Sequence, residues 1–383
     1  MGSVELAERQ PNTLGPLDTP IRSVAARALW VPFRKPIVTP NYQISGIDTI
    51  VVRVVDADGA TGYGYLWCVL ESQVPVLIEA LRCLARCVRD ASPASIGAVH
   101  ARLRNDVNFL GLKGVGVFAL SALDMAVHDL RCRRLGLSLG KLLGRVRDRV
   151  PVYWSGLMLT ENDDDLVREA EELVSRGFRA CKIRVGRNSI EEDARRIALI
   201  REHTPANMTL MLDAVQYYTP QEALRACRRF AEFSPHWLEE PVVHNDYAAL
   251  RHIVSKAQVP IAGGENEYLP EGFRELLDTG LDYLLVDLER VGGITGWLET
   301  ASLTATGVTV MTPHVYPHVC VQLGSASQAR ETWVEYMPWW DELMTYELTV
   351  DDGQMVVPDI AGIGIDPDPQ SLDRFARHEW QSL

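Results

Sequence analysis

Residues 236–242 read HWLEEPV, an apolar run that ends in two glutamates and a proline. Trp237 and Leu238 are typical of a buried strand, whereas a carboxylate at the end of such a strand needs water, a cation or a hydrogen-bond partner. The function of Glu239 and Glu240 therefore depends on what the rest of the chain places beside them.

The second half of the chain repeats one pattern, in which short apolar strands alternate with amphipathic helices. Strands are predicted at VPVYWSG (150–156), ACKIRVG (180–186), TLMLDA (209–214), HWLEEP (236–241), VPIAGGE (259–265), DYLLVDLE (282–289), VTVMTPH (308–314) and WVEYM (333–337). Repeated βα units predict a parallel sheet, and eight in succession predict an α/β fold of the (β/α)8 TIM-barrel type. An open doubly wound sheet is the structural alternative, but no Gly-x-Gly-x-x-Gly sequence follows the first strand.

The first half of the chain has a different pattern. Strand-like segments are SVAARALWVPF (23–33), TIVVRVVDADG (49–59) and GYGYLWC (62–68), and helical periodicity follows in SQVPVLIEALRCLARCVRD (72–90) and GVGVFALSALDMAVHDLRCRRLG (114–136). Strands followed by helices predict a compact α+β domain. We therefore predict a polar N-terminal tail at residues 1–20, an α+β domain at 21–148, the barrel at 149–345 and a C-terminal segment at 346–383.

Composition and charge exclude several classes of protein. The 383 residues are 47% hydrophobic and 23% charged, which is ordinary for a globular chain that is long enough for two domains. The formal net charge of -13 disfavours nucleic-acid and anionic-membrane partners, because both need clustered Lys and Arg. No uninterrupted apolar run reaches the roughly 18 residues of a membrane helix. The first twenty residues do not resemble a signal peptide, and the 7 cysteines show no ligand spacing, so a reduced, cytoplasmic location is expected.

Charged side chains end the predicted strands from the second to the eighth. In a barrel the carboxyl ends of all strands share one rim, which is where active sites of this fold are built. The residues at those ends are Lys182, Arg184, Asp213, Glu239, Glu265, Asp287, His314 and Glu335. Such a concentration of charge predicts a functional site at the rim.

Three of these carboxylates predict a metal site. Asp213, Glu239 and Glu265 come from successive strands, so their charges would repel one another unless a cation lay between them. Carboxylate oxygens without Cys or His favour Mg²⁺, which keeps positions for water and substrate oxygens. Spacing alone also allows Glu240 as the ligand and Glu239 as a structural residue.

The next two strand ends predict a general base. Asp287 can hydrogen-bond one imidazole nitrogen of His314 and direct the other toward the substrate. His318 is a competing base, but its position predicts the following loop or helix. Glu335 can stabilise a developing oxyanion if its surroundings keep it protonated, and an ordinary ionised rim glutamate is the alternative.

The segments CKIRVG, MLDAVQ, WLEEP, GGENEY, VDLERVGGITGW, MTPH and WVEYM together resemble, in order and spacing, the enolase superfamily and within it the mandelate racemase subgroup. GYGYLWC and GVGVFALSALDMAVHDL are similar to the capping-domain loop and helix of that family, so the resemblance covers about residues 25–345. It implies a modified barrel, a capping α+β domain whose loops contribute to specificity, and a C-terminal segment that returns to the cap. It also suggests a symmetric homo-oligomer, such as a dimer or an octamer.

The resemblance further implies roles for the rim residues. Asp213, Glu239 and Glu265 would bind Mg²⁺, Asp287 and His314 would form the catalytic dyad, and Glu335 would be the electrophilic group. The shared step of the family is abstraction of a proton alpha to a carboxylate, with Mg²⁺ stabilising the resulting enediolate.

Two positions depart from the family pattern. Arg184 stands where the subgroup often has the second lysine of a Lys-x-Lys pair, and arginine stays protonated and so cannot act as a base. Val215 stands where the family often has an asparagine two residues after the first metal ligand, which removes a polar group near the metal.

The first departure favours one reaction. Racemisation needs proton transfer on both faces of the substrate, and only His314 is clearly competent. The sequence therefore predicts a Mg²⁺-dependent dehydratase, a hydro-lyase, in which His314 takes the alpha proton of an acid sugar or related polyhydroxy acid and then protonates the departing hydroxyl to give a 2-keto acid. The alternatives are a racemase or epimerase of a 2-hydroxy acid, and a metal-binding homologue that has lost catalysis.

Residues that contact the substrate are predicted at two places. Lys182 and Arg184 would bind the substrate carboxylate or stabilise charge, unless Arg184 only pairs with a rim carboxylate. The cap loops at residues 32–47 and 62–70 would supply Arg34, Tyr65 and Trp67. Trp339 and Trp340 would either line the pocket or pack against the cap.

Overall fold

The structure is a computed structural model of the 383-residue chain, and it describes residues 17–38, 43–186, 189–305, 307–328 and 332–383. Most of the expected N-terminal tail and residues 39–42 of the first expected specificity loop lie outside these ranges. Arg34 belongs to a described strand, but its side chain is outside the described part of the structure.

The N-terminal domain is built on an antiparallel sheet. Its strands are β1 (Ile21–Val38), β2 (Gln43–Asp56), β3 (Thr61–Cys68) and the short C-terminal strand β14 (Gln381–Ser382), in the order β14-β1-β2-β3. The turn between β2 and β3 forms because the Asp56 carboxylate accepts the N–H groups of Asp58 (3.0 Å) and Ala60 (2.9 Å). Gly59 takes a φ of 87° there, a conformation that favours glycine.

Helices α1 (Val74–Ala85), α2 (Ile96–Asn108) and α3 (Val115–Leu135) cover one side of this sheet, and the short α4 (Leu139–Leu142) follows them. α3 is buried along most of its length, because β3 lies on it and helices of the second domain pack against it. A Cβ at Gly64 of β3 would clash with the carbonyl oxygen of Ala122, so glycine is what lets strand and helix approach this closely. Among the described residues, no helix combines the length and the apolar character that crossing a membrane requires.

The second domain is a curled parallel sheet, which confirms the predicted modified (β/α)8 barrel. Its strands are β4 (Arg149–Ser155), β5 (Ala180–Arg184), β6 (Thr209–Asp213), β7 (Trp237–Glu239), β8 (Ile261–Gly263), β9 (Tyr283–Asp287), β10 (Val310–His314) and β11 (Val334–Tyr336). β11 pairs in parallel with β4, and β10 meets β11 through the Thr312 hydroxyl, which accepts the N–H of Trp333 (2.9 Å) and donates to its carbonyl (2.6 Å).

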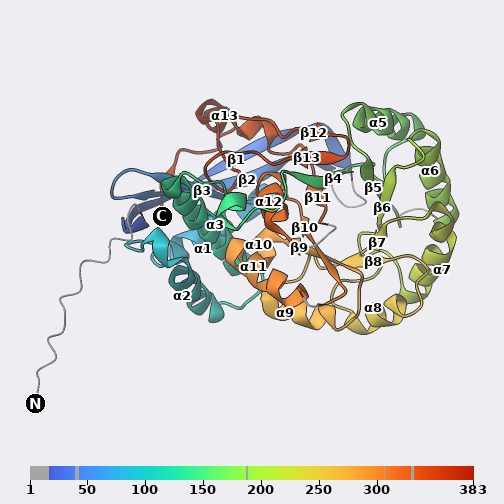
Figure 1. The fold of residues 1–383 in the computed structure, drawn as a ribbon, viewed down its shortest axis with the longest axis horizontal. Helices are drawn as coiled ribbons and strands as arrows, with labels where there is room; N and C mark the ends of the chain where they lie inside the picture. Colours follow the sequence, from blue (N-terminus) through green and yellow to red (C-terminus); the bar gives the residue numbers. More distant parts are fainter. Residues whose placement is uncertain (1–16, 39–42, 187–188, 306, 329–331) are drawn as a thin grey trace, which may run out of the picture.

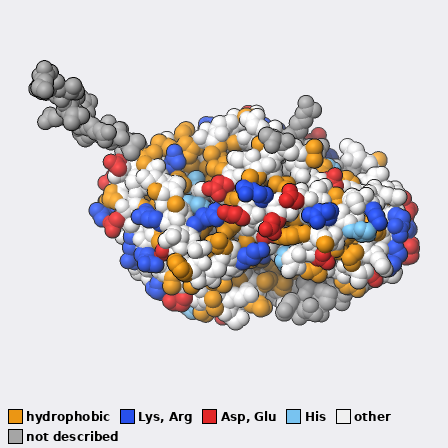
Figure 2. Space-filling view, turned by 90° about the horizontal axis from the view of Figure 1, so that it is seen from below, with side chains coloured by type: hydrophobic (Ala, Val, Ile, Leu, Met, Phe, Trp, Pro, Cys, Tyr) orange, Lys and Arg blue, Asp and Glu red, His pale blue; other side chains and the backbone are white. Residues whose placement is uncertain are grey.

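Helices follow most of the strands and form the outer layer. They are α5 (Asp163–Ser175), α6 (Ile190–Glu202), α7 (Pro220–Phe230), α8 (Tyr247–Val254), α9 (Leu269–Leu277), α10 (Leu288–Val291), α11 (Gly293–Thr304) and α12 (Pro317–Ala326). Figure 1 shows α5 to α9 around the outside of the sheet, with the N-terminal domain on the opposite side of the molecule. Acidic and basic side chains lie interspersed on the face drawn in Figure 2.

Side chains fill the barrel interior below the rim. Tyr153, Ala180, Met211, Trp237, Ala262 and Leu285 form one buried cluster. They come from successive strands, and Trp237 meets Tyr153 edge-on at 5.6 Å between ring centroids. The barrel is therefore a packed core, and the polar strand ends lie above it.

The C-terminal segment contacts both domains. β12 (Val350–Asp351) and β13 (Gln354–Val356) form a hairpin, and β13 pairs antiparallel with β4 of the barrel. α13 (Pro369–Arg374) follows, and β14 then pairs with β1 of the cap. Backbone pairing of one segment with both sheets ties the two domains together.

Candidate active site

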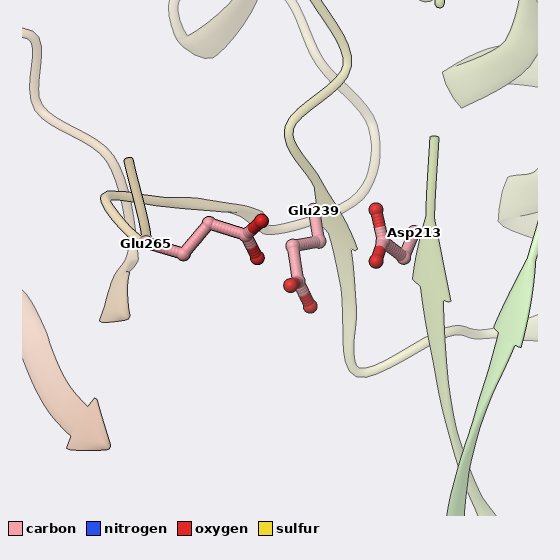
Figure 3. Close-up of side chains that lie close together, drawn as sticks. All are labelled: Asp213, Glu239 and Glu265. Atoms are coloured by element: carbon pink, nitrogen blue, oxygen red, sulfur yellow. The ribbon is translucent and has the colours of Figure 1, made fainter. Parts of the chain in front are cut away.

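Three carboxylates converge at the carboxyl ends of β6, β7 and β8. Asp213 and Glu239 are the last residues of their strands and lie in register with each other, and Glu265 follows β8 by two residues. Each residue offers an oxygen that lies within 4.8 Å of the others. Figure 3 shows the three side chains close together. Among the described residues, no other group of three His, Cys, Asp or Glu side chains meets this condition. An all-oxygen set of this kind fits a hard divalent cation and leaves positions for water and substrate oxygens.

The backbone conformation at Glu240 directs its side chain to other partners than those of Glu239. Glu240 has a φ of 39°, and its carboxylate accepts hydrogen bonds from the Gln216 side-chain amide (2.7 Å) and the Asn266 side-chain amide (3.0 and 3.1 Å). Burial, followed by the nearby Glu265 charge, raises the pKa of Glu240. Asn266 also donates to Glu265 (3.3 Å), so Glu240 acts on the cluster through Asn266. Glu239, and not Glu240, lies in the carboxylate group.

Sequence reasoning assigned no function to Gln216 or Asn266. Their positions in the quoted segments MLDAVQ and GGENEY, directly beside metal-ligand candidates, were the available signal.

Lys182 lies beneath the cluster as a fully buried cation. Its Nζ is 2.8 Å from Oε1 of Glu239, 2.8 Å from Oε1 of Glu335 and 3.7 Å from Oδ2 of Asp213. Burial alone lowers the pKa of Lys182, but Glu239 and then Glu335 outweigh it and raise that pKa. Lys182 therefore stays charged and holds three carboxylates in place.

Arg184 occupies the Asp213 end of the cluster. Its Nη1 is 2.9 Å from Oδ2 of Asp213, and its Nη2 donates to Oγ of Ser155 (3.3 Å). Burial alone lowers the pKa of Arg184, but Asp213 and the other carboxylates outweigh it and raise that pKa. The Arg184 side chain as a whole is 14% exposed, whereas its Nη1 atom is buried.

His314 occupies the Glu265 end. Its Nδ1 lies 2.7 Å from Oδ2 of Asp287, and Oδ1 of Asp287 accepts the N–H groups of Glu289 (2.9 Å) and Arg290 (3.1 Å) at the start of α10. These bonds fix the carboxylate, which in turn directs Nε2 of His314 toward Glu265 (3.4 Å). The pair has the arrangement of a base and its orienting residue.

The ionisation of His314 depends on the carboxylates around it. Burial alone lowers the pKa of His314, but Glu265, Glu335 and the hydrogen bond to Asp287 raise it to about 9. A divalent cation on Asp213, Glu239 and Glu265 would offset the Glu265 contribution and bring that pKa down.

Glu335 is held as a carboxylate. Its Oε2 accepts the N–H of Val315 (3.0 Å) and lies 3.7 Å from Nε2 of His314. Burial alone raises the pKa of Glu335, but Lys182, His314 and Arg184 outweigh it and lower that pKa. The sequence-based role required a protonated Glu335, whereas these three cations favour the ionised form. A catalytic role for Glu335 stays a prediction.

Other predicted site residues lie outside this group. His318 is fully buried in the first turn of α12, meets Tyr346 edge-on at 5.8 Å, and has a pKa that burial lowers to about 3. Tyr65 is 2% exposed and packs against Tyr316 at 4.8 Å, so its side chain belongs to an aromatic core. Trp67 is half-buried and contacts Trp339 edge-on at 5.6 Å. The substrate contacts predicted for Tyr65 and Trp67 stay predictions.

The backbone of Val215 contacts one of the metal-ligand candidates. The N–H of Val215 donates to Oδ1 of Asp213 (2.8 Å), and its side chain is 54% exposed. Its φ of 47° is costly for a β-branched residue, so strain is stored beside a metal-ligand candidate.

Trp340 is fully buried and donates to the Thr49 hydroxyl (2.9 Å), which ties the segment after β11 to the cap.

Comparison with known proteins places the chain in a family. Residues 22–144 match the mandelate racemase / muconate lactonizing enzyme N-terminal domain, and residues 165–371 match the enolase C-terminal domain-like family. The chain is 32% identical over 331 residues to 3,6-anhydro-alpha-L-galactonate cycloisomerase of Streptomyces coelicolor, covering 86% of this chain and 91% of that protein.

Two solved structures have the same fold. An L-talarate dehydratase from Polaromonas sp. JS666, in complex with Mg and L-glucarate, is 29% identical with a TM-score of 0.89, over 95% of this chain and 99% of the other. A racemase from Streptomyces coelicolor A3(2) with bound magnesium is 31% identical with a TM-score of 0.88, over 93% of this chain and 99% of the other.

The chain belongs to the enolase superfamily, in its mandelate racemase subgroup, which confirms the resemblance inferred from its motifs. It is an enzyme of a family that includes dehydratases, cycloisomerases and epimerases. Its cofactor is Mg²⁺, and the Asp213, Glu239 and Glu265 oxygens provide a donor set that suits this ion.

Proposed function

We propose that the chain is a Mg²⁺-dependent dehydratase of an acid sugar or related polyhydroxy acid. The observation that carries this proposal is the asymmetry of the two ends of the carboxylate cluster. His314 at the Glu265 end has an orienting carboxylate and a titratable nitrogen. Arg184 at the Asp213 end and Lys182 beneath the cluster have raised pKa values and stay protonated. One base serves a reaction in which the alpha proton is removed and the departing hydroxyl is protonated on the same face of the substrate.

The steps follow from these positions. Neutral Nε2 of His314 takes the proton from the carbon alpha to the substrate carboxylate, and the imidazolium formed is stabilised by Asp287 through Nδ1 (2.7 Å). The same Nε2–H then protonates the hydroxyl that leaves from the beta carbon, so one water is lost. The enol that remains tautomerises to a 2-keto acid. Bound Mg²⁺ would supply the positive charge that stabilises the enediolate.

We assign Arg184 to binding of the substrate and Lys182 to positioning of the carboxylates. The guanidinium of Arg184 is the proposed N–H donor for the substrate carboxylate, and Lys182 keeps Glu239 and Glu335 in fixed positions. The Ser155 hydroxyl accepts a hydrogen bond from Nη2 of Arg184 (3.3 Å). Arg184 and Lys182 are therefore proposed as substrate-anchoring and positioning residues.

The names of relatives support the substrate class. The L-talarate dehydratase from Polaromonas was solved with L-glucarate, and the Streptomyces cycloisomerase is named for an anhydrogalactonate. Both compounds are carboxylates of sugar skeletons. An acid sugar is accordingly the substrate class that we propose for this chain.

A screen of acid sugars tests the proposal. Purified enzyme with Mg²⁺ is incubated with mono- and dicarboxylic sugar acids, and 2-keto acid product is detected with semicarbazide. The expected result is a product signal that EDTA removes, that Mg²⁺ restores, and that is absent in His314→Asn. Product formation that persists in His314→Asn would refute His314 as the base.

A racemase or epimerase is the second candidate, because a solved racemase covers 93% of this chain at 31% identity. Reaction in deuterium oxide separates the two functions. Recovered substrate with deuterium at the alpha carbon and inverted configuration would establish racemisation, whereas a keto acid without inversion would establish dehydration.

A further inference from the structure

A cavity of about 550 Å³ lies beside the proposed active site, between the cap and the barrel. Its walls come from β1 of the cap, from the end of β4 with the following α5, and from the segment after β11. Ser155 lines the cavity and accepts a hydrogen bond from Arg184, which contacts Asp213 of the carboxylate cluster. Ser155 thus connects this space to Arg184, and the volume of the cavity suits a small metabolite.

The charge of the cavity wall is predominantly negative. Among the described residues, three basic side chains line it, Lys35, Arg168 and Arg176, against six acidic ones: Glu161, Asp165, Glu169, Glu172, Asp341 and Glu342. An excess of carboxylates faces the cavity even if each base neutralises one acid.

The basic side chains already have partners. Lys35 of the cap bonds Glu161 and lies 3.5 Å from Asp165, and Arg168 also bonds Asp165. Arg176 lies over the Trp154 ring at 4.8 Å and donates to the Tyr336 hydroxyl (3.1 Å). A carboxylate that entered the cavity would have to displace one of these contacts and would face the remaining acids.

The same wall suits hydroxyl groups and apolar C–H faces. The carboxylates of Glu161 and Asp165 are hydrogen-bond acceptors, which complement hydroxyl donors. Phe33 of the cap and Trp339 after β11 stack at 5.2 Å with an interplanar angle of 22°, and both line the cavity. A polyhydroxy chain presents both kinds of surface.

We propose that this cavity receives the end of the substrate remote from the reacting carboxylate, and that its acidic wall selects a monocarboxylic sugar acid over a dicarboxylic one. The inference rests on the proposed function, since it assigns the substrate class of the same site. Glu161 and Asp165 are the specificity-determining residues. Both line the cavity, and both contact Lys35, the cap lysine that lines it among the described residues.

Matched pairs of substrates test this inference. The enzyme is assayed with gluconate against glucarate and with galactonate against galactarate, and kcat/KM is measured for keto acid formation or, in deuterium oxide, for alpha-proton exchange. We expect the monoacid of each pair to be favoured by about tenfold or more, from the repulsion between like charges in a partly buried cavity. Preference for the diacids would overturn the inference and leave the proposed dehydratase intact.

Two neighbouring residues of α5 provide a matched comparison. Asp165→Asn removes a charge that lines the cavity, and Asp164→Asn removes an equal charge from an exposed position outside it. Asp165→Asn should lower the monoacid-to-diacid ratio by about tenfold, and Asp164→Asn should leave it unchanged. Glu161→Gln should lower the ratio by less at neutral pH, because burial and Glu169 raise the pKa of Glu161 to about 7. Equal shifts in Asp164→Asn and Asp165→Asn would contradict a local role. If no substrate of either class gives keto acid or exchange, the proposed function itself fails.

Discussion

Nη1 of Arg184 lies 2.9 Å from Oδ2 of Asp213, so a guanidinium is paired with the first of the three metal-ligand candidates. A Mg²⁺ ion bound by the three candidates would share the Asp213 carboxylate with Arg184. Because a guanidinium stays protonated, the Asp213 end of the cluster can bind an anion but cannot accept a proton from a substrate.

Substitution of Arg184 should separate metal binding from substrate binding. Arg184→Gln removes a cation that competes at Asp213, so Mg²⁺ affinity measured by titration calorimetry should increase by about tenfold. The same change removes donors for the substrate carboxylate and should raise KM by about tenfold or more. Arg225→Gln, at an exposed position on α7, is the control for loss of one positive charge. An unchanged KM in Arg184→Gln would show that Arg184 only pairs with Asp213.

His314→Asn should abolish turnover while the protein keeps its fold. Loss of the base that touches the alpha proton should lower kcat by at least about a thousandfold. Mg²⁺ affinity and the thermal midpoint check that the site remains assembled, and His252→Asn, at an exposed position on α8, is the control. Retained alpha-proton exchange in His314→Asn would point to a different base.

The two glutamates of HWLEEPV should respond differently to the same substitution. Glu239→Gln removes a metal-ligand candidate and should weaken Mg²⁺ binding by about a hundredfold or more, whereas Glu240→Gln acts through Asn266 and should weaken it by about tenfold. Titration calorimetry of both variants measures the difference. The reverse order would make Glu240 the ligand.

The pKa of His314 should fall when Mg²⁺ binds. Without metal the surrounding carboxylates raise it to about 9, and a cation on Glu265 offsets part of that effect. Histidine ring signals followed by NMR across pH should therefore titrate lower with Mg²⁺ than with EDTA. Since the base must be neutral, activity should rise with pH through the lower value. A pKa that is the same in both conditions would contradict the predicted coupling.

Glu161 should make stability depend on pH. Burial and the neighbouring Glu169 raise the pKa of Glu161 from 4.5 to about 7, so the folded state binds this proton more tightly than the unfolded state. The free energy of unfolding should then decrease as pH rises from 4.5 to 7. Glu161→Gln removes the penalty, and its stability relative to wild type should improve by about 2 kcal/mol between pH 4.5 and pH 8 in urea unfolding. Asp164→Asn should show no such trend.

Much of the fold was accessible from the sequence, because the strand pattern itself dictates geometry. Eight apolar strands that alternate with helices lead to a barrel, and residues at the ends of parallel strands must meet at one rim. This is why the sequence groups Asp213, Glu239 and Glu265 at one rim and places His314 beside Asp287.

The roles of Glu240 and Glu335 could not be predicted in the same way. Spacing left Glu239 and Glu240 equivalent, and the structure separates them through the φ of 39° at Glu240 and the amides of Gln216 and Asn266. The ionisation of Glu335 in β11 depends on Lys182 in β5, whose Nζ lies 2.8 Å from Oε1 of Glu335 although the two strands are far apart in the sequence. Charges at such distances decide pKa values, and no sequence pattern states those distances.

By itself, the sequence determined the barrel, the family and the carboxylate cluster, since strand periodicity and the position of each charged residue at a strand end carry that information along the chain. Only the tertiary structure decided which glutamate joins the cluster, how Glu335 ionises, and that Lys35 of β1 meets Glu161 and Asp165 at the start of α5 in an acidic cavity. The physical reason is that these properties arise from distances between segments far apart in the chain, which packing of the cap on the barrel sets.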